Sequence, residues 1–197
     1  MSSHHFVKEG QEPALIITEA VAFAVVEPLL EWAPMVIVMQ NAVDQVNAWG
    51  IKTDVVITHL HDTQYMIQKL MDQMPVKILS YNHPDEQLDT ALFYLISNKQ
   101  FVVNIITQSA EKYINKAEKF TDRVEIIVMD EHIKWFSVKS GYFTKWIPAN
   151  TRLLVQHEQG EISLSGAAKM ENRKITARQD GLITLSSDHL FWVGEYL

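Results

Sequence analysis

Six short apolar runs, rich in Val and Ile, recur through the first 130 residues of this chain. They read ALIIT (14–18), MVIVMQ (35–40), DVVIT (54–58), VKILSY (76–81), FVVNIIT (101–107) and VEIIVMD (124–130). Each run is too short for an independent helix, and unbroken apolar character is typical of strands that are buried on both faces. The sequence therefore predicts about five or six central strands in this part of the chain.

Helical patterns lie between these runs. They cover residues 42–49, residues 63–74 and a segment that begins at Asp85 or Asp89. Gly50 and Pro75 are ordinary signals for the ends of the first two helices. Because strands and helices alternate, we expect a doubly wound parallel sheet, a Rossmann-like α/β domain, over residues 1–130. β-Hairpins before residue 50 would contradict this prediction.

The pattern changes after about residue 131. Seven segments there tend to alternate apolar with polar residues, namely HIKWFSV, YFTKWI, TRLLVQH, EISLS, KITARQ, LITLSS and HLFWVGEYL. Glycines stand in several of the gaps between them. Short strands of period two, separated by turn residues, predict a small antiparallel β-sandwich over residues 131–197.

Composition excludes several classes of protein. The 197 residues carry a net charge of −7, which argues against nucleic acid as a partner because phosphates need a basic face. Cysteine is absent, so there are no disulfides, thiolate metal sites or cysteine nucleophiles. No apolar run approaches the roughly 18–20 residues of a membrane span, and the N-terminus lacks the apolar core of a signal peptide. We therefore expect no membrane partner and a cytoplasmic location.

Glycine is absent between Gly50 and Gly141, which covers most of the predicted α/β domain. Nucleotide sites in such domains usually bring backbone N–H groups close to phosphate through a glycine-containing turn. Neither G-x-G-x-x-G nor G-x-x-x-x-G-K-[ST] occurs in the chain. An ordinary glycine-loop nucleotide site is therefore disfavoured, and phosphate would have to bind elsewhere or through side chains.

The stretch HLHD, residues 59–62, follows the third apolar run directly. In an extended strand His59 and His61 point to the same face, which suits two imidazoles on one metal ion such as Zn²⁺. THLHD also resembles the start of the T-H-x-H-x-D-H signature of the metallo-β-lactamase fold, although Asp62 comes one position early. Further zinc ligands would have to come from His83, His132, His157 or His189. This interpretation makes the chain a metal-dependent hydrolase that uses His59 and His61.

Two other interpretations of HLHD stay open. It is either an ordinary strand-end loop, in which Asp62 or Thr63 caps the following helix, or the remnant of another motif. The order of elements along the whole chain favours the remnant.

An α/β domain followed by a short β-sandwich resembles thiamine pyrophosphokinase over nearly all of the chain. The best local match is NAVDQVNAWGIKTDVVITHLHD (41–62), against a glycine–alanine turn, a G-I-x-P-D loop and a strand that runs into G-D-x-D-S. A weaker match is DEQLDTALFYL (85–95), against the helix start Q-D-x-T-D-x-x-K-A-L. The resemblance implies transfer of pyrophosphate from ATP to thiamine, with Mg²⁺ held by carboxylates.

The resemblance also implies a homodimer whose site, for thiamine or a related molecule and a nucleotide, lies between subunits. The apolar segments FWVGEYL and KWI offer surface for such pairing. We expect the terminal strand, which ends at Leu197, to be a candidate buried edge.

The carboxylates and glycines of the family's site are mostly missing from this chain. D-G-G-A falls on residues 39–42 without its acid or its glycines, and G-D-x-D-S falls on residues 58–62 with His59 and His61 at the metal-binding aspartates. Mg²⁺ prefers hard oxygen ligands, and two imidazoles suit it badly. We therefore expect a thiamine pyrophosphokinase-like protein that either has much weakened activity or is inactive and reduced to binding or scaffolding.

The resemblance assigns roles to a few remaining residues. Asp62, in the position of the serine, and Asp89, reached by a two-residue gap, are the candidate catalytic residues. Asp62 also joins His59 and His61 as a candidate metal ligand. The candidates for binding nucleotide or thiamine are Asn41, Asp85, Gln87 and Asn172. Among these, Asn172 is the nearest counterpart of a Ser-Asn pair that contacts thiamine in the family.

Overall fold

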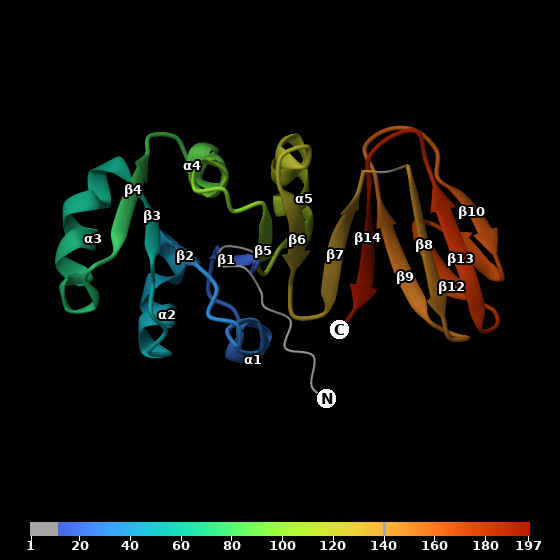
Figure 1. The fold of residues 1–197 in the computed structure, drawn as a ribbon, viewed down its shortest axis with the longest axis horizontal. Helices are drawn as coiled ribbons and strands as arrows, with labels where there is room; N and C mark the ends of the chain where they lie inside the picture. Colours follow the sequence, from blue (N-terminus) through green and yellow to red (C-terminus); the bar gives the residue numbers. More distant parts are fainter. Residues whose placement is uncertain (1–11, 140) are drawn as a thin grey trace, which may run out of the picture. The chain divides into compact units, whose positions relative to one another are not determined.

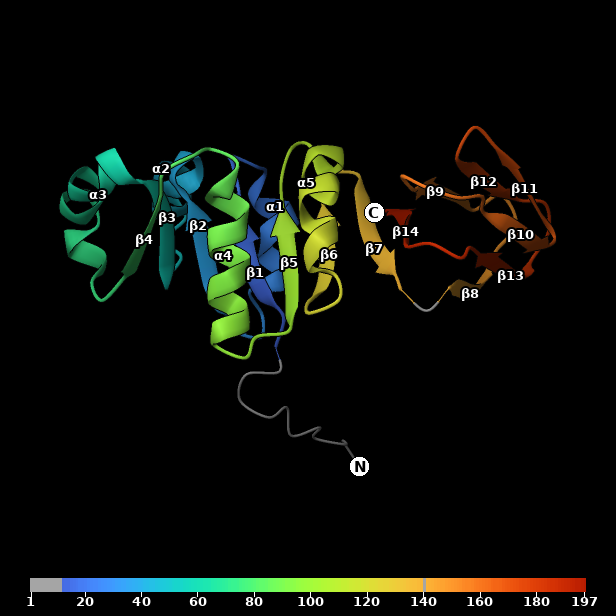
Figure 2. The same ribbon diagram turned by 90° about the horizontal axis from the view of Figure 1, so that it is seen from above.

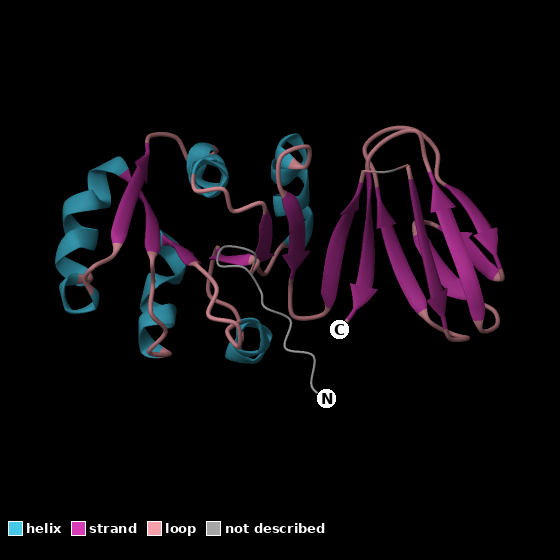
Figure 3. Cartoon of the chain, viewed as in Figure 1, coloured by secondary structure: helices cyan, strands magenta, loops and turns pink. Residues whose placement is uncertain are grey.

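The computed structural model describes residues 12–139 and 141–197. The chain divides into two compact units, Met1–Glu131 and His132–Leu197. All of the described helices belong to the first unit, and the second is built from strands and turns (Figures 1 and 3).

A parallel sheet of six strands forms the centre of the first unit. Its strands are β1 Ala14–Ile17, β2 Val36–Met39, β3 Val55–His59, β4 Lys77–Tyr81, β5 Val102–Ile106 and β6 Glu125–Met129. They lie in the order β4-β3-β2-β1-β5-β6, and every adjacent pair is parallel. Each strand coincides with one of the six apolar runs, so the prediction of a parallel sheet in the first 130 residues is confirmed.

Helices lie on both faces of this sheet. They are α1 Phe23–Val26, α2 Val43–Ala48, α3 Thr63–Lys69, α4 Glu86–Ser97 and α5 Ala110–Ala117. Figures 1 and 2 show α1 and α2 on one face and α4 and α5 on the other. Short 3₁₀ turns are Glu27–Leu29, Gln40–Ala42, Leu60–Asp62, Met71–Gln73 and Glu118–Phe120. Within the described ranges no helix is long and apolar enough to cross a membrane.

The burial of β1 explains why the apolar runs are unbroken. All four of its residues are fully buried. Leu15 and Ile17 belong to a core that includes Val43 and Val46 of α2. Ile16 points to the opposite face, because side chains alternate along a strand. A central strand that is covered on both faces has no position for a polar side chain, so its sequence shows no alternation.

Two antiparallel sheets make up the second unit. The strands are β7 Ile133–Val138, β8 Tyr142–Ile147, β9 Arg152–Gln156, β10 Ser163–Gly166, β11 Ala168–Glu171, β12 Lys174–Ala177, β13 Gly181–Ser186 and β14 Phe191–Tyr196. One sheet has the order β7-β14-β9-β12-β11 and the other β8-β13-β10. Alternate residues of both sheets, among them Leu153, Ile175 and Ile183, share one apolar core. The prediction of antiparallel strands after residue 131 is confirmed.

Two details of the second unit differ from the sequence-based expectations. The sequence does not predict β11, because Ala168 to Glu171 contains no β-branched or aromatic residue. This strand pairs with β12 through a two-residue turn, in which Asn172 and Arg173 have φ values of 46° and 65°. The expectation that β14 is a sheet edge is wrong, because β14 pairs with β7 on one side and β9 on the other.

Candidate functional site at the carboxyl edge of the parallel sheet

The carboxyl ends of the six parallel strands meet at one edge of the first unit. The chain leaves β1 for β2, β3 and β4 on one side and later returns to β5 and β6 on the other side of β1. In open α/β sheets, ligands bind outside the carboxyl ends of the strands at such a reversal of strand order. The residues that follow β1, β2, β3, β4 and β5 are therefore the candidate site.

Glu19 connects the two strands at this reversal. Its Oε1 accepts hydrogen bonds from the Thr107 hydroxyl at 2.7 Å and from the Gln108 N–H at 2.9 Å. The side chain of Gln108 in turn donates to the carbonyl of Ala20. Thr18, fully buried at the end of β1, donates its hydroxyl to the Ile106 carbonyl at 3.0 Å. The crevice between β1 and β5 is thus bridged by hydrogen bonds within the protein.

Gln40 connects β2 to β3 in the same way. Its Oε1 accepts from the Thr58 hydroxyl at 2.7 Å and from the His59 N–H at 3.0 Å. Its Nε2 donates to Oδ2 of Asp62 at 2.7 Å. All four polar groups of the Gln40 network are at least partly buried. The candidate catalytic residue Asp62 is therefore held at the edge by a neutral amide.

The ring of His59 is fixed by two hydrogen bonds. Nε2 lies 3.0 Å from the carbonyl of Asn82, and Nδ1 accepts the N–H of His61 at 3.2 Å. A carbonyl can only accept, so the tautomer with hydrogen on Nε2 satisfies both contacts. The ring also meets Tyr81 edge-on at a centroid distance of 5.5 Å. Neither nitrogen is open to a metal ion in this arrangement.

His61 stacks on His59 rather than converging with it. The two ring centroids are 4.9 Å apart, with 26° between the planes. Two imidazoles that share a metal ion must aim their nitrogen lone pairs at one point, which face-to-face rings do not do. Across residues 12–139 and 141–197, no group of three or more His, Asp or Glu side chains is arranged to hold a metal ion.

Two tyrosines next to this edge have raised pKa values. Burial raises the pKa of Tyr81, and the nearby Asp62 carboxylate raises it further. Burial is also the main reason that the pKa of Tyr113 on α5 is raised, with a smaller contribution from Glu19. Both phenols stay neutral at pH 7. Tyr113 is buried, so only the half-buried Tyr81 has surface near this edge.

The two candidate carboxylates at the start of α4, Asp85 and Asp89, form ion pairs with lysines of the neighbouring helical segment. Oδ1 of Asp85 lies 2.8 Å from Nζ of Lys116, and this hydrogen bond is the main reason that the Asp85 pKa is lowered. Oδ2 of Asp89 lies 2.5 Å from Nζ of Lys119. The structure therefore directs both carboxylates to α5 and the 3₁₀ turn that follows it.

The other predicted residues lie at separate places. Asn41 is exposed in the turn after β2, and Gln87 is half-buried in the first turn of α4. Asn172 is exposed in the β11–β12 turn of the second unit. The structure therefore brings His59, His61 and Asp62 together at one strand end, and it does not gather the remaining candidates around them.

Sequence reasoning missed several residues of the edge. Gln40 was counted inside an apolar run, and Glu19 and Gln108 follow their strands without any motif. Glu86 was also missed, although its Oε2 accepts the N–H groups of Asn82 at 3.1 Å and His83 at 3.2 Å. These two backbone hydrogen bonds lower the pKa of Glu86. The available signal was position alone, because Glu19 and Gln108 directly follow apolar runs and Gln40 ends one.

Comparisons with known proteins give a match in structure and none in sequence. No protein-family profile and no curated protein sequence matches the chain. Thiamin pyrophosphokinase from Geobacillus thermodenitrificans aligns with a TM-score of 0.68 at 10% identity, over 92% of this chain and 97% of that one. The Candida albicans enzyme gives 0.68 at 8% identity, over 95% and 89%. The Bacillus subtilis enzyme gives 0.62 at 12%, over 93% and 98%.

These alignments each extend over more than nine-tenths of the chain and so include both of its units. At 8–12% identity, similarity of this kind establishes a shared fold. The resemblance found in the sequence is therefore confirmed at the level of structure: this chain has the thiamin pyrophosphokinase fold.

Proposed function

We propose that this chain is a cytoplasmic, thiamine pyrophosphokinase-like protein that binds a small molecule and has weak or no pyrophosphate transfer. In this proposal residues 1–130 are a Rossmann-like domain of the catalytic type, and residues 131–197 are a β-sandwich of the thiamine-binding type. The shared fold supports the family reaction as the ancestral activity. The side chains at the strand ends support the proposal that pyrophosphate transfer is weak or lost.

The observation that carries this proposal is the environment of His59. The resemblance places a metal-binding aspartate at this position. Here an imidazole stands there, with both nitrogens hydrogen-bonded inside the protein and its face against His61. The side chains at this edge thus form hydrogen bonds with other groups of the protein. The family reaction needs oxygen ligands that are directed at Mg²⁺ instead.

The remaining carboxylates do not fit Mg²⁺ and ATP in the manner that the resemblance implies. Asp85 and Asp89 each form an ion pair with a lysine, and Asp62 accepts a hydrogen bond from Gln40. An octahedral Mg²⁺ site would need these contacts to open and the side chains to turn toward one point. The glycines that let phosphate approach the backbone are also absent from the strand ends.

The second candidate, a metal-dependent hydrolase at His59 and His61, gains no support from the geometry. A hydrolytic zinc site needs three protein ligands and an open position for water. The stacked rings and the hydrogen-bonded nitrogens of His59 leave no such set. The binding homologue is the better proposal.

Calorimetric titration tests the proposal. We expect thiamine to give a heat of binding and Mg²⁺ to add no affinity for ATP. Zn²⁺ alone should bind more weakly than about 1 mM, which corresponds to about −4 kcal/mol. The double variant His59→Asp/His61→Asp should gain affinity for ATP with Mg²⁺, because it restores two carboxylates at the strand end. His83→Asp, an exposed position nearby, is the matched control and should gain none. Micromolar binding of ATP that is lost when Mg²⁺ is left out would contradict the proposal.

We also propose that the chain forms a homodimer. On β8, an edge strand of the second unit, the side chain of Trp146 is 57% exposed, and its cross-strand partner Leu182 is 62% exposed. An exposed apolar pair on a sheet edge is suited to pairing with another chain. Sedimentation should show a dimer at micromolar concentration, and Trp146→Glu should weaken it at least about tenfold. Asn98→Glu, in the first unit, should not. A single 22.6 kDa species for the native chain would contradict this prediction.

A further inference from the structure

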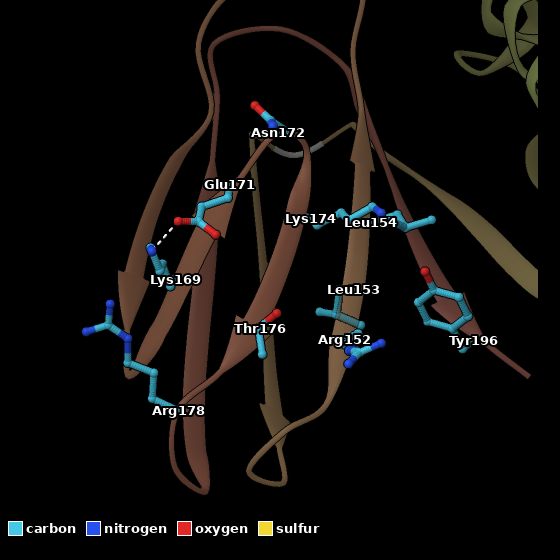
Figure 4. A pocket seen from close by; sticks show the side chains of 10 residues that line it. All are labelled: Arg152, Leu153, Leu154, Lys169, Glu171, Asn172, Lys174, Thr176, Arg178 and Tyr196. Atoms are coloured by element: carbon cyan, nitrogen blue, oxygen red, sulfur yellow. Dashed lines mark ion pairs between the residues drawn. The ribbon is translucent and has the colours of Figure 1, made fainter.

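A groove of about 630 Å³ lies on the outer face of β9, β11 and β12 in the second unit (Figure 4). Such a volume falls in the range that holds a small organic ligand. The groove is lined by Arg152, Leu153, Leu154, Lys169, Glu171, Asn172, Lys174, Thr176, Arg178 and Tyr196. None of these residues belongs to the first unit, so the groove is a feature of the second unit alone.

The register of the three strands places polar side chains in this groove. Arg152 pairs with Thr176, and Thr176 pairs with Lys169 on its other side. These three residues are exposed, whereas the next residues along the strands, Leu153 and Ile175, are buried in the core. Side chains alternate along a strand, so the neighbours of these buried residues point outward into the groove.

The groove is basic within an acidic protein. The first unit has 9 Lys and Arg against 18 Asp and Glu, and the second has 8 against 6, so their formal charges are −9 and +2. Four of those eight basic residues line the groove, namely Arg152, Lys169, Lys174 and Arg178. The groove contains one acidic residue, Glu171, which pairs with Lys169. No carboxylate of the described residues forms an ion pair with Arg152, Lys174 or Arg178.

The groove also has an apolar and hydroxyl-bearing part. Leu154 is half-buried, and the ring of Tyr196 is 51% exposed at the side of the groove next to Arg152. In Figure 4, Thr176 lies between Arg152 on one side and Lys169 and Arg178 on the other. A ligand with a compact anionic group near Thr176 would place its organic part against Leu154 and Tyr196.

We propose that this groove binds a small phosphorylated molecule through its phosphate or diphosphate group. Arginine is suited to this role because its planar guanidinium donates two parallel hydrogen bonds to phosphate oxygens. Two arginines and two lysines, less the one glutamate, give the groove a formal charge of +3, which suits a diphosphate. The same charges repel an unphosphorylated organic cation such as thiamine, so this inference takes Asn172, which lines the groove, out of the thiamine-binding candidates. The inference does not rest on the proposed function, because it concerns a site without Mg²⁺ or any residue of the parallel sheet.

Titration with inorganic pyrophosphate, without Mg²⁺ and at low salt, tests the proposal. We expect saturable binding that weakens as salt is added, because the contacts are between charges near the surface. The double variant Arg152→Gln/Arg178→Gln should lose at least about tenfold in affinity, and Lys174→Gln should lose less. Arg173→Gln removes an exposed arginine that lies outside the groove and should change the affinity less than about twofold.

Three results would overturn the proposal. The first is the absence of pyrophosphate binding by the native chain. The second is a loss of affinity in Arg173→Gln that equals the loss in the double variant. The third is displacement of pyrophosphate by thiamine that binds as tightly as pyrophosphate does. A further contradictory outcome is that the double variant keeps its affinity for pyrophosphate but dissociates in sedimentation, which would make the groove an interface with a second copy. Circular dichroism of each variant verifies that the fold is kept. The experiment is independent of ATP and Mg²⁺, so it can fail without the proposed function failing.

Discussion

Purified protein, freed of any host enzyme, is expected to form thiamine diphosphate from ATP at least about 100-fold more slowly than an ordinary turnover of about 1 s⁻¹. Phosphoryl-type transfer depends on Mg²⁺ that bridges phosphate oxygens and neutralises developing charge. Loss of one well-placed stabilising group costs about 10²–10³ in rate. Here His59 and His61 stand at both of the metal-binding positions that the resemblance assigns, and the turn after β2 has no glycine.

The measurement is a timed assay of the product by chromatography at saturating thiamine, ATP and Mg²⁺. The double variant His59→Asp/His61→Asp should be faster than the native chain, and His83→Asp should equal it. Such losses within one catalytic unit do not simply add, so the gain need not reach the family's rate. A native turnover of about 1 s⁻¹ or more would contradict the prediction. It would mean that Asp62, Asp85 and Asp89 leave their present partners to hold the metal ion.

Replacement of Gln40 by alanine is expected to lower the free energy of unfolding by about 2–4 kcal/mol. The change leaves the Thr58 hydroxyl and the His59 N–H without their acceptor, and a buried donor that loses its partner costs about 1–3 kcal/mol. Thr58 is fully buried, so water does not reach its hydroxyl in place of the amide. Urea denaturation followed by circular dichroism measures the change.

Two further variants show whether the loss comes from these hydrogen bonds. Gln64→Ala removes an exposed glutamine of α3 and should change stability by less than about 0.5 kcal/mol. Gln40→Glu keeps an acceptor for Thr58 and His59 but places a carboxylate next to Asp62. Its destabilisation should shrink as the pH falls and one carboxyl is protonated. Equal stability of Gln40→Ala and the native chain would show that the network contributes nothing.

The fold could be predicted from the sequence wherever burial alone decides the pattern. β1, β2, β3 and β5 are buried at nearly every position, so each is an apolar run whose position the sequence shows. The missed strand β11 has half-buried Ala168 and Met170 on its inner side and charged residues on its outer side, a pattern that is weak in four residues. The interior position of β14 was also missed, because chain order does not give the neighbours of a strand.

The candidate site could be predicted only in part, because its contacts join residues that are far apart in sequence. HLHD was correctly located at the end of a strand. The ion pairs of Asp85 and Asp89 with Lys116 and Lys119 depend on how α4 and the α5 segment pack, which no local pattern encodes. The same holds for Gln40, whose three hydrogen-bond partners lie 18 to 22 residues away.

The central position of β1 also has a consequence for the order in which the chain can fold. β1 is synthesised first, but its neighbour β5 begins 88 residues later, at Val102. At about 5–20 residues per second, a ribosome needs roughly 5–20 s to add that segment. During this interval the edge of β1 carries unpaired N–H and C=O groups beside fully apolar side chains, which is a template for pairing with another chain. Nascent chains that end before β5 should therefore be the species that depends most on chaperones.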